Sequence, residues 1–249
     1  PDPKAHLIAL DKRTGKTVWK IDDPDVNIAG RTDGFRGNKS RGWICSFSTP
    51  ILVKTANREA LVMSYPGSLA GIQPNTGKLL WQCGGLNPLI YSSPIAGENV
   101  VVGMGGFFGT TVAVAADGSG DMTPKTLWRT ERTPNRLGSG VVHQGHVYVL
   151  NTNGIMECLE LKTGKVKFSE RVRGRGPKQE SWSSMLLAGD KIFIPNQSGE
   201  TIVLRAKPKF ELIGINSLDG TLTNSSLAAS EGQFFLRTHK HLWCIGKRK

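Results

Sequence analysis

The sequence lacks any long hydrophobic run: no stretch of about eighteen apolar residues occurs among its 249 residues, so no membrane-spanning helix is predicted. No signal peptide is recognisable at its start. Its four cysteines form neither a Cys-x-x-Cys motif nor an adjacent pair, which leaves zinc-ribbon and thioredoxin-like chemistry without support. It also contains no nucleophile elbow, phosphate-binding loop or dinucleotide fingerprint. Several common enzyme classes therefore have no motif here.

Acidic residues are scarce relative to basic ones, with 20 Asp and Glu against 32 Lys and Arg, a net charge of +12. This balance favours anionic partners or surfaces. Basic residues cluster in "RVRGRGPK" (residues 171–178), "RAKPK" (205–209) and the tail "KRK" (247–249). These clusters fall mostly in turns, where solvated charge is usual, and they lack the interleaved aromatics of a nucleic-acid interface. Nucleic acid is therefore not an expected partner.

Helical periodicity is absent from every window, and short β-branched or aromatic runs bounded by Gly, Asn, Asp and Pro take its place. Five of these runs share a start: "FSTPILV", "YSSPIAG", "GSGVVHQ", "WSSMLLA" and "NSSLAAS". Each is followed by a second and a third strand-like run. The sequence predicts an all-β fold whose first strands begin at Phe47, Tyr91, Gly138, Trp182 and Asn224.

An internal repeat organises these strands. "ALDKRTGKTVW" (residues 9–19) returns as "GIQPNTGKLLW" (71–81) and "CLELKTGKVKF" (158–168). A degenerate copy, "VAVAADGSGDMTPKTLW" (112–128), keeps the strand and the Trp but replaces the tight turn with a longer loop. The implied period of roughly 40–45 residues is the length of one four-stranded propeller blade.

The repeated motif has a physical explanation. Asp11 can accept hydrogen bonds from nearby backbone N–H groups, and Gly15 supplies the positive φ that a tight reversal requires. A small residue at the start of the motif leaves room for a neighbouring blade. We therefore expect the aromatic side chain at the end of the motif to dock between blades. A ligand cage is the alternative interpretation of the Trp rings. The expected docking residues are Ala9, Gly15, Trp19, Gly77, Trp81, Trp128, Gly164 and Phe168.

The repeat predicts one propeller domain. It consists of a part-blade at 1–22, an insertion loop at 22–42, blades at about 43–86, 87–134, 135–176 and 177–218, and an incomplete last blade at 219–249. The first repeat enters at its third strand and the last stops before its fourth. Either the N-terminus closes the last blade, or the chain is the C-terminal part of a longer propeller, which we favour.

No metal site is predicted. His143 and His146 flank one turn, and His239 and His241 alternate along one strand, but neither pair has a visible third ligand. Cys158 and Cys244 fall at the small position of the repeat, so we interpret them as small buried hydrophobic residues.

The candidate ligand-binding residues lie where first strands open onto the channel mouth of a propeller. Aromatic residues with one Arg and one Glu would make a small-molecule or peptide site there, although the aromatics can also simply plug the channel. The insertion loop, which carries Arg31, Arg36 and Arg41, is a second candidate surface. The candidate mouth residues are Phe47, Tyr91, Arg136, Glu180, Trp182 and Asn224.

Taken together, the three motif copies and the "SSP" first strands resemble the tryptophan-docking repeat of pyrroloquinoline-quinone-type β-propellers. The closing stretch from "KPKFELIGINSLDG" onward is similar to the last blades of bacterial quinone-binding-like repeat proteins and of the outer-membrane-protein assembly lipoprotein. The resemblance implies four-stranded antiparallel blades in a ring, often of eight blades, in an exported or periplasmic protein of the bacterial envelope.

The same resemblance implies two possible activities. Quinoprotein dehydrogenases of alcohols or sugars hold pyrroloquinoline quinone with calcium, an Asp base and a disulfide between adjacent cysteines, a pair that this sequence lacks. The lipoprotein type is a non-catalytic scaffold, which we favour, with no catalytic residue, no metal and no cofactor. Its expected partner is a protein, a peptide or an anionic envelope component. The dehydrogenase, with part of its catalytic groups in missing blades, is the alternative.

Overall fold

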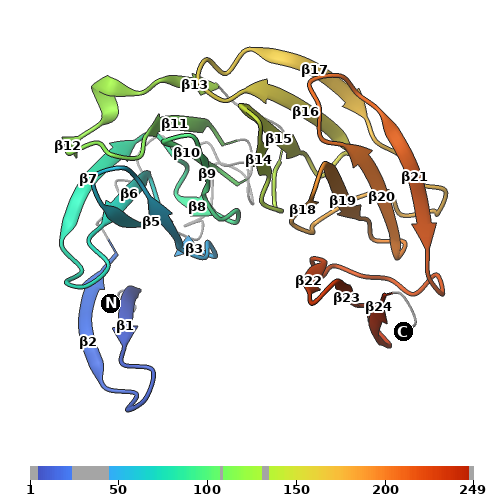
Figure 1. Cartoon of the computed structure of the whole chain (residues 1–249), viewed down its shortest axis with the longest axis horizontal. Helices are drawn as coiled ribbons and strands as arrows, with labels where there is room; N and C mark the ends of the chain where they lie inside the picture. Colours follow the sequence, from blue (N-terminus) through green and yellow to red (C-terminus); the bar gives the residue numbers. More distant parts are fainter. Residues whose placement is uncertain (1–4, 24–44, 107–108, 131–134, 247–249) are drawn as a thin grey trace, which may run out of the picture. The chain divides into compact units, whose positions relative to one another are not determined.

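The structure, a computed structural model, describes residues 5–23, 45–106, 109–130 and 135–246. Within these ranges the chain forms β-strands and one short 3-10 helix, η1 (Thr123–Lys125), and it contains no α-helix (Figure 1). No helix in the described part of the chain has the length and apolar character needed to cross a bilayer. The all-β prediction is confirmed.

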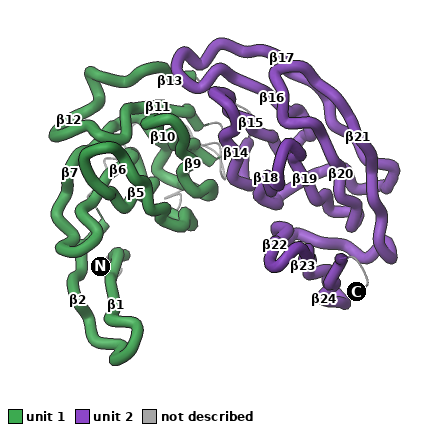
Figure 2. The backbone as a smooth tube through the Cα atoms, viewed as in Figure 1, with its two compact units in different colours: residues 1–133 green, residues 134–249 purple. Residues whose placement is uncertain are grey.

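The chain divides into two compact units, Pro1–Thr133 and Pro134–Lys249 (Figure 2). Unit 1 contains a hairpin, two larger sheets and a short parallel pair. The hairpin is β1 (His6–Leu10) with β2 (Thr17–Asp22), and the parallel pair is β3 (Cys45–Ser46) with β8 (Leu89–Ile90). The first larger sheet consists of β4 (Ile51–Lys54), β5 (Glu59–Tyr65), β6 (Ser68–Ile72), β7 (Leu79–Gly84) and β12 (Gly120–Asp121). The second consists of β9 (Ile95–Gly97), β10 (Val100–Met104), β11 (Thr111–Ala115) and β13 (Trp128–Thr130).

Unit 2 contains two four-stranded sheets and one three-stranded sheet, each an antiparallel meander in chain order. The first is β14 (Val141–His143), β15 (His146–Leu150), β16 (Ile155–Glu160) and β17 (Val166–Arg171). The second is β18 (Leu186–Ala188), β19 (Lys191–Pro195), β20 (Glu200–Arg205) and β21 (Leu212–Ser217), and the third is β22 (Ala228–Ser230), β23 (Gln233–Arg237) and β24 (Leu242–Ile245). These meanders are propeller blades, as the repeat predicts.

The Thr-Gly-Lys turns join the third and fourth strands of their blades. Gly15, Gly77 and Gly164 all have φ near +70°, at 71°, 72° and 71°. At the first turn, Asp11 Oδ1 accepts hydrogen bonds from the backbone N–H of Arg13 (3.0 Å) and Thr14 (2.8 Å). The glycine conformation and the side-chain acceptor together explain why the motif recurs.

Aromatic docking joins neighbouring blades in unit 1. Trp19 Nε1 donates to the carbonyl of Pro74 (2.9 Å), and a β-carbon built on Gly77 would lie 2.9 Å from the Trp19 ring. Trp81 repeats the arrangement one blade later, where its Nε1 donates to the carbonyl of Ala116 (3.1 Å). Since Trp81 is fully buried, it contributes a large apolar area to the junction.

The same position is occupied differently in unit 2. Phe168 contacts Phe210 of the next blade edge to face, with ring centroids 5.8 Å apart. In the first blade of unit 2, Phe168 pairs with Cys158. The equivalent pair in the next blade is Gly214 with Val203, so Gly214 occupies the position of the aromatic residue. The fourth strand β21 therefore presents no aromatic side chain at the docking position.

The hydrophobic core of each unit lies between adjacent sheets rather than within one. In unit 1 it joins residues of β4–β7 with residues of β10 and β11, among them Val62, Leu69 and Val101. In unit 2 it joins β15 and β16 with β19 and β20, among them Tyr148 and Ile194. Each blade needs its neighbour to bury its second face, as expected for stacked repeats.

The first strands begin later than the sequence suggested. They start at Ile51, Ile95, Val141, Leu186 and Ala228, about four residues after the predicted starts. The intervening residues use serine hydroxyls in place of strand ladders: Thr49 N–H donates to Ser93 Oγ (2.9 Å), and Ser184 N–H donates to Ser226 Oγ (2.9 Å). Because each bond joins equivalent positions of neighbouring blades, the "SSP"-like segments connect blades instead of extending a strand.

Candidate functional site

The predicted mouth residues of unit 1 lie against each other. Phe47 and Tyr91 stack with ring centroids 5.4 Å apart and an interplanar angle of 19°. They directly follow β3 and β8, the parallel pair. Phe47 N–H continues this pairing by donating to the carbonyl of Ile90 (2.9 Å). Phe47 is 57% exposed, so the pair forms an accessible aromatic surface.

The predicted mouth residues of unit 2 do not form one cluster. Asn224 Oδ1 accepts a hydrogen bond from Gln197 Nε2 (2.9 Å), and the carbonyl of Glu180 accepts one from Gln197 N–H (2.8 Å). Trp182 is 47% exposed. Gln197 thus joins two of the predicted residues, and nothing in the sequence motif marked it.

Arg136 departs from the expectation of an open mouth. Its side chain is buried, with the residue 2% exposed, and it forms an ion pair with Glu157 of β16. Burial lowers the pKa of the Arg136 guanidinium, while the neighbouring Glu157 carboxylate raises it. A buried and paired arginine contributes to packing of its blade, and it is not presented to a ligand in solvent.

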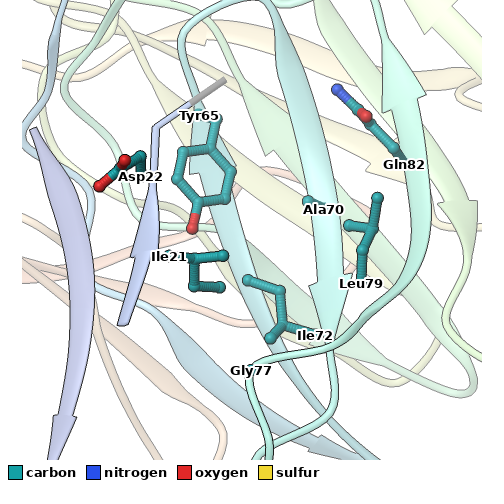
Figure 3. Close-up of a pocket in the computed structure, with 8 residues that line it drawn as sticks. All are labelled: Ile21, Asp22, Tyr65, Ala70, Ile72, Gly77, Leu79 and Gln82. Atoms are coloured by element: carbon teal, nitrogen blue, oxygen red, sulfur yellow. The ribbon is translucent and has the colours of Figure 1, made fainter. Parts of the chain in front are cut away.

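A cavity in unit 1 is too small for a ligand site of ordinary size. It has a volume of about 140 Å³ and lies between the β1–β2 hairpin and the sheet of β5–β7 (Figure 3). Its lining is mostly apolar, with the ring of Tyr65 beside Ile21 and Ile72. Burial raises the pKa of Tyr65 to about 12, so this phenol remains neutral. Ligand pockets are typically ~300 Å³ or more, and we interpret this space as imperfect packing between blades.

The most structured polar feature of unit 2 is the connection between β17 and β18, which carries the "RGRGPK" stretch. We call residues 173–178 the basic loop. Arg173, Arg175 and Lys178 are all exposed. Among the described residues, no carboxylate forms an ion pair with any of the three. The loop therefore presents three cationic side chains to solvent.

Glu200, at the start of β20, holds the backbone of the basic loop. Its carboxylate accepts hydrogen bonds from Arg175 N–H (2.8 and 3.0 Å to its two oxygens), Gly176 N–H (3.0 Å) and Asn196 Nδ2 (2.7 Å). Glu200 is only 4% exposed. Burial by itself would raise the pKa of Glu200, but these hydrogen bonds outweigh it and hold the pKa below its ordinary value.

Further contacts close the loop around this carboxylate. Ser198 Oγ accepts from Lys178 N–H (2.8 Å), and Gly174 N–H donates to Gln179 Oε1 (2.6 Å). A β-carbon on Gly174 would lie 1.9 Å from Glu200 Oε2. A glycine is thus required at that position because the backbone approaches the carboxylate closely. Four backbone N–H groups of the loop are thus bonded within the chain, while the side chains of Arg173, Arg175 and Lys178 are exposed.

The sequence predicts only solvated charge for this stretch and does not predict the role of Glu200, because the two segments are far apart in the chain. Two signals were present. Glycines alternate with arginines in "RGRG", and Glu200 begins a third strand where the other third strands begin with His6, Ser68, Thr111, Ile155 and Leu242. An acid at that position is unusual within this chain, and it has a specific partner. The other predicted surface, the insertion loop with its three arginines, lies mostly outside the described residues.

The dehydrogenase alternative implies two features, a metal-binding cluster and a disulfide between adjacent cysteines. In the described part of the chain, no group of three or more His, Cys, Asp or Glu side chains could hold a metal ion. The cysteines are free thiols, and none is adjacent to another in sequence. The described residues therefore contain no such group of side chains and no vicinal disulfide.

Sequence comparison identifies one family. The family model described as outer membrane protein assembly factor BamB matches residues 2–87 and 109–243, most of the chain. A search of curated protein sequences gave no match.

Solved structures with the same fold include proteins of different activities. BamB from Moraxella catarrhalis is 14% identical with a TM-score of 0.57, over 96% of this chain and 76% of that protein. Quinohemoprotein alcohol dehydrogenase from Comamonas testosteroni is 16% identical with a TM-score of 0.61, over 93% of this chain and 48% of the enzyme. BBS1N in complex with ARL6DN is 13% identical with a TM-score of 0.61, over 98% and 71%. At these identities the similarity shows the β-propeller fold, which hosts unrelated functions.

Proposed function

Because the chain belongs to the family of the outer membrane protein assembly factor BamB, we propose that it is a non-catalytic scaffold that binds a protein partner in the bacterial cell envelope. A periplasmic or otherwise exported location is part of this proposal. The observation that carries it is the basic loop, whose backbone is fixed by a buried carboxylate while its cationic side chains face solvent.

Two physical arguments support a binding role for this loop. A loop held by internal hydrogen bonds loses little conformational entropy when a partner docks, so more of the contact energy appears as affinity. Arginine is also enriched at protein interfaces, where its planar fork pairs with carboxylates. The net charge of +12 would further attract an acidic surface. We therefore propose that the partner presents carboxylates to the basic loop.

A charge-reversal experiment tests this role. The variant R173E/R175E/K178E changes the exposed side chains and leaves Glu200 and the glycines of the loop in place. K12E/R13E/K16E makes the same charge change in the exposed β1–β2 turn and serves as the matched control. Both proteins are expressed in the source cell's envelope, cross-linked in place, and the captured proteins are identified and quantified by mass spectrometry.

We expect the basic-loop variant to capture about tenfold less of one specific envelope protein than the unmodified chain, and the control to change capture by less than about twofold. Higher ionic strength should weaken capture of the unmodified chain, since the contact is electrostatic. Equal capture by both variants would contradict the proposal, because it would remove the basic loop from the interface.

The dehydrogenase alternative is tested with the quinone itself. Pyrroloquinoline quinone and calcium are added to the purified chain, and quinone absorbance and dye reduction are followed with alcohols and sugars as substrates. The scaffold proposal expects no saturable quinone binding and no turnover. Saturable binding with turnover would replace the scaffold by an enzyme.

A further inference from the structure

The outer edges of the blades are protected in different ways. Edge strands usually carry charged residues, because an uncharged edge invites pairing with another chain. The fourth strands β2, β13 and β17 follow this rule, since each contains Lys or Arg. β7 (LLWQCG) and β21 (LIGINS) contain no charged residue.

β7 is covered by another segment of the same chain. The loop that replaces the tight turn in the degenerate repeat forms β12, which pairs in parallel with β7 through Gly120 with Trp81 and Asp121 with Gln82. Met122 N–H then donates to the carbonyl of Gln82 (2.7 Å), and Gly84 N–H donates to Thr123 Oγ1 (2.9 Å). The molecule thus covers one uncharged fourth strand by adding a strand to it.

β21 has no such cover. It is the last strand of its sheet, and among the described residues no strand pairs with its outer edge (Figure 1). Leu212 and Ile213, which lie at the bulge of β21, are 47% and 41% exposed. A β-carbon on Gly214 would meet no atom within 4 Å, so space is open at the position where β7 carries its docking Trp. Two exposed apolar side chains thus precede an open position at Gly214 on this edge.

Positive charge lies at the C-terminal end of this edge. Ser217, the last residue of β21, is paired with Glu200 of β20. Glu200 in turn accepts the hydrogen bonds that hold the basic loop, including that from Arg175 N–H. The backbone of the basic loop is therefore held next to the residue that pairs with the end of β21, where an added strand would begin or finish.

From these observations we propose that the outer edge of β21 accepts an extended segment of a partner protein as an additional strand. The segment has alternating apolar side chains, of which a large one covers Gly214, and an acidic residue that contacts the basic loop. This inference rests on the proposed scaffold function and identifies the edge that the partner occupies. Strand addition supplies main-chain hydrogen bonds, and the side-chain positions supply selectivity.

A further uncharged edge at the end of a sheet, that of β24, is a weaker candidate. β24 (LWCI) also lacks charge and has exposed Leu242 and Ile245. Among the described residues β24 pairs with β23 alone, and it corresponds to the third strand of a blade. In the other two sheets of unit 2 the third strand is covered by the fourth strand of the same blade. β21 is itself a fourth strand, so its edge is a position for a foreign segment.

The test uses synthetic peptides and the full chain. The probe is a short fluorescent peptide that alternates Thr with Val and Phe and begins with two Asp residues. A second peptide of the same composition carries the two Asp at its C-terminus, and a third has the sequence scrambled. Binding is measured by fluorescence anisotropy, and hydrogen exchange of the chain is measured with and without peptide.

We expect one of the two ordered peptides to bind better than the other and better than the scrambled one. The preferred end gives the strand direction, because the acidic end must lie beside the basic loop. Binding should slow hydrogen exchange in residues 212–217, since their outward N–H groups become bonded. Protection confined to another strand, equal affinity of the two ordered peptides, or no binding would overturn the proposal.

The variant L212K puts a charge on the edge and should weaken peptide binding by about tenfold. V166K is the matched control, because Val166 is 50% exposed and precedes the bulge of β17 as Leu212 precedes that of β21. It should change binding by less than about twofold. Equal effects of the two substitutions would place the peptide elsewhere.

The results separate this inference from the function on which it rests. If R173E/R175E/K178E abolishes capture of the envelope protein while L212K has no effect on capture or on peptide binding, strand addition is wrong and the scaffold role stands. If the chain dimerises in analytical ultracentrifugation and L212K abolishes the dimer, a second copy occupies the edge and the partner segment is overturned.

Discussion

Trp81 and Phe168 occupy the same position of the repeat, yet the blade junctions that they form differ in burial and in hydrogen bonding. Trp81 is fully buried and donates its indole N–H to Ala116 of the next blade. Phe168 is only half-buried, has no polar atom to donate, and meets Phe210 edge to face. Equivalent positions of the repeat can therefore carry different aromatic residues that contribute unequally to the stability of the blade junction. In unit 2 the Glu200 carboxylate bonds the basic loop at the start of β20, whereas Phe210 follows the end of that strand.

The most severe test of this comparison is truncation of the two rings. W81A should lower the free energy of unfolding by about 3–5 kcal/mol, since it removes a fully buried indole and leaves a cavity. F168A should cost about 1–2 kcal/mol, because less ring area is withdrawn from water. Urea denaturation followed by circular dichroism measures both values, and equal losses would contradict the unequal roles of the two junctions.

The space beneath Trp81 gives a second test. G71A places a β-carbon 2.2 Å from Trp81 Nε1, so it should destabilise the chain by about 1–3 kcal/mol. G214A is the control, because its β-carbon meets nothing within 4 Å and alanine is the better strand residue. Thermal unfolding should show a clear loss for G71A and no loss for G214A. A tolerated G71A would mean that the indole is not packed against Gly71.

The carboxylate that holds the basic loop in unit 2 can be removed with E200Q. The amide replaces one acceptor oxygen by a donor facing backbone N–H groups, so we expect a loss of about 1–3 kcal/mol. The pKa of Glu200 is lowered in the folded chain, so its contribution is present above the ordinary carboxyl pKa and is lost as pH falls through the folded value. Stability measured from neutral to acidic pH should therefore fall less steeply in E200Q. Parallel curves for the two proteins would show that Glu200 does not hold the loop.

The smallest expected effect concerns the exposed network at the outer end of the same blade. Hydrogen bonds from Lys191 and Arg205 lower the pKa of Asp190 to about 2. Its contribution is present above the ordinary Asp pKa near 4 and is lost as pH falls toward 2. Because these groups are exposed, solvent screens them, and D190N should barely change stability at neutral pH. A large loss at neutral pH would mean that this turn contributes more than the aromatic junction.

The turns and the positions of the aromatic residues Trp19 and Trp81 between blades could be predicted from the chain because they are local or repeated, whereas the partners of these rings were not predicted. Gly15, Gly77 and Gly164 sit in one motif, and a shared φ follows from a shared turn. The indole rings recur with the period of a blade, so their position between blades follows from the repeat. The turns depend on residues close in sequence, and the ring positions depend on the spacing of the repeat along the chain.

Other features could not be predicted because they join segments without a common motif. β12 pairs with β7 although it belongs to the loop of a degenerate repeat. Glu200 binds the basic loop from more than twenty residues away, and Arg136 is buried against Glu157 instead of lining an open mouth. Each contact is set by which loops the packed blades bring together, and residue type alone does not specify that choice.

The sequence by itself determined the all-β class, the blade period and the aromatic docking positions, since backbone turn chemistry and hydrophobic alternation act over a few residues and then repeat. Only the tertiary structure decided which edges are covered and which charges are buried, because those outcomes depend on how each loop satisfies its backbone groups once the blades have packed. The exposed edge of β21 and the fixed basic loop beside it belong to this second class.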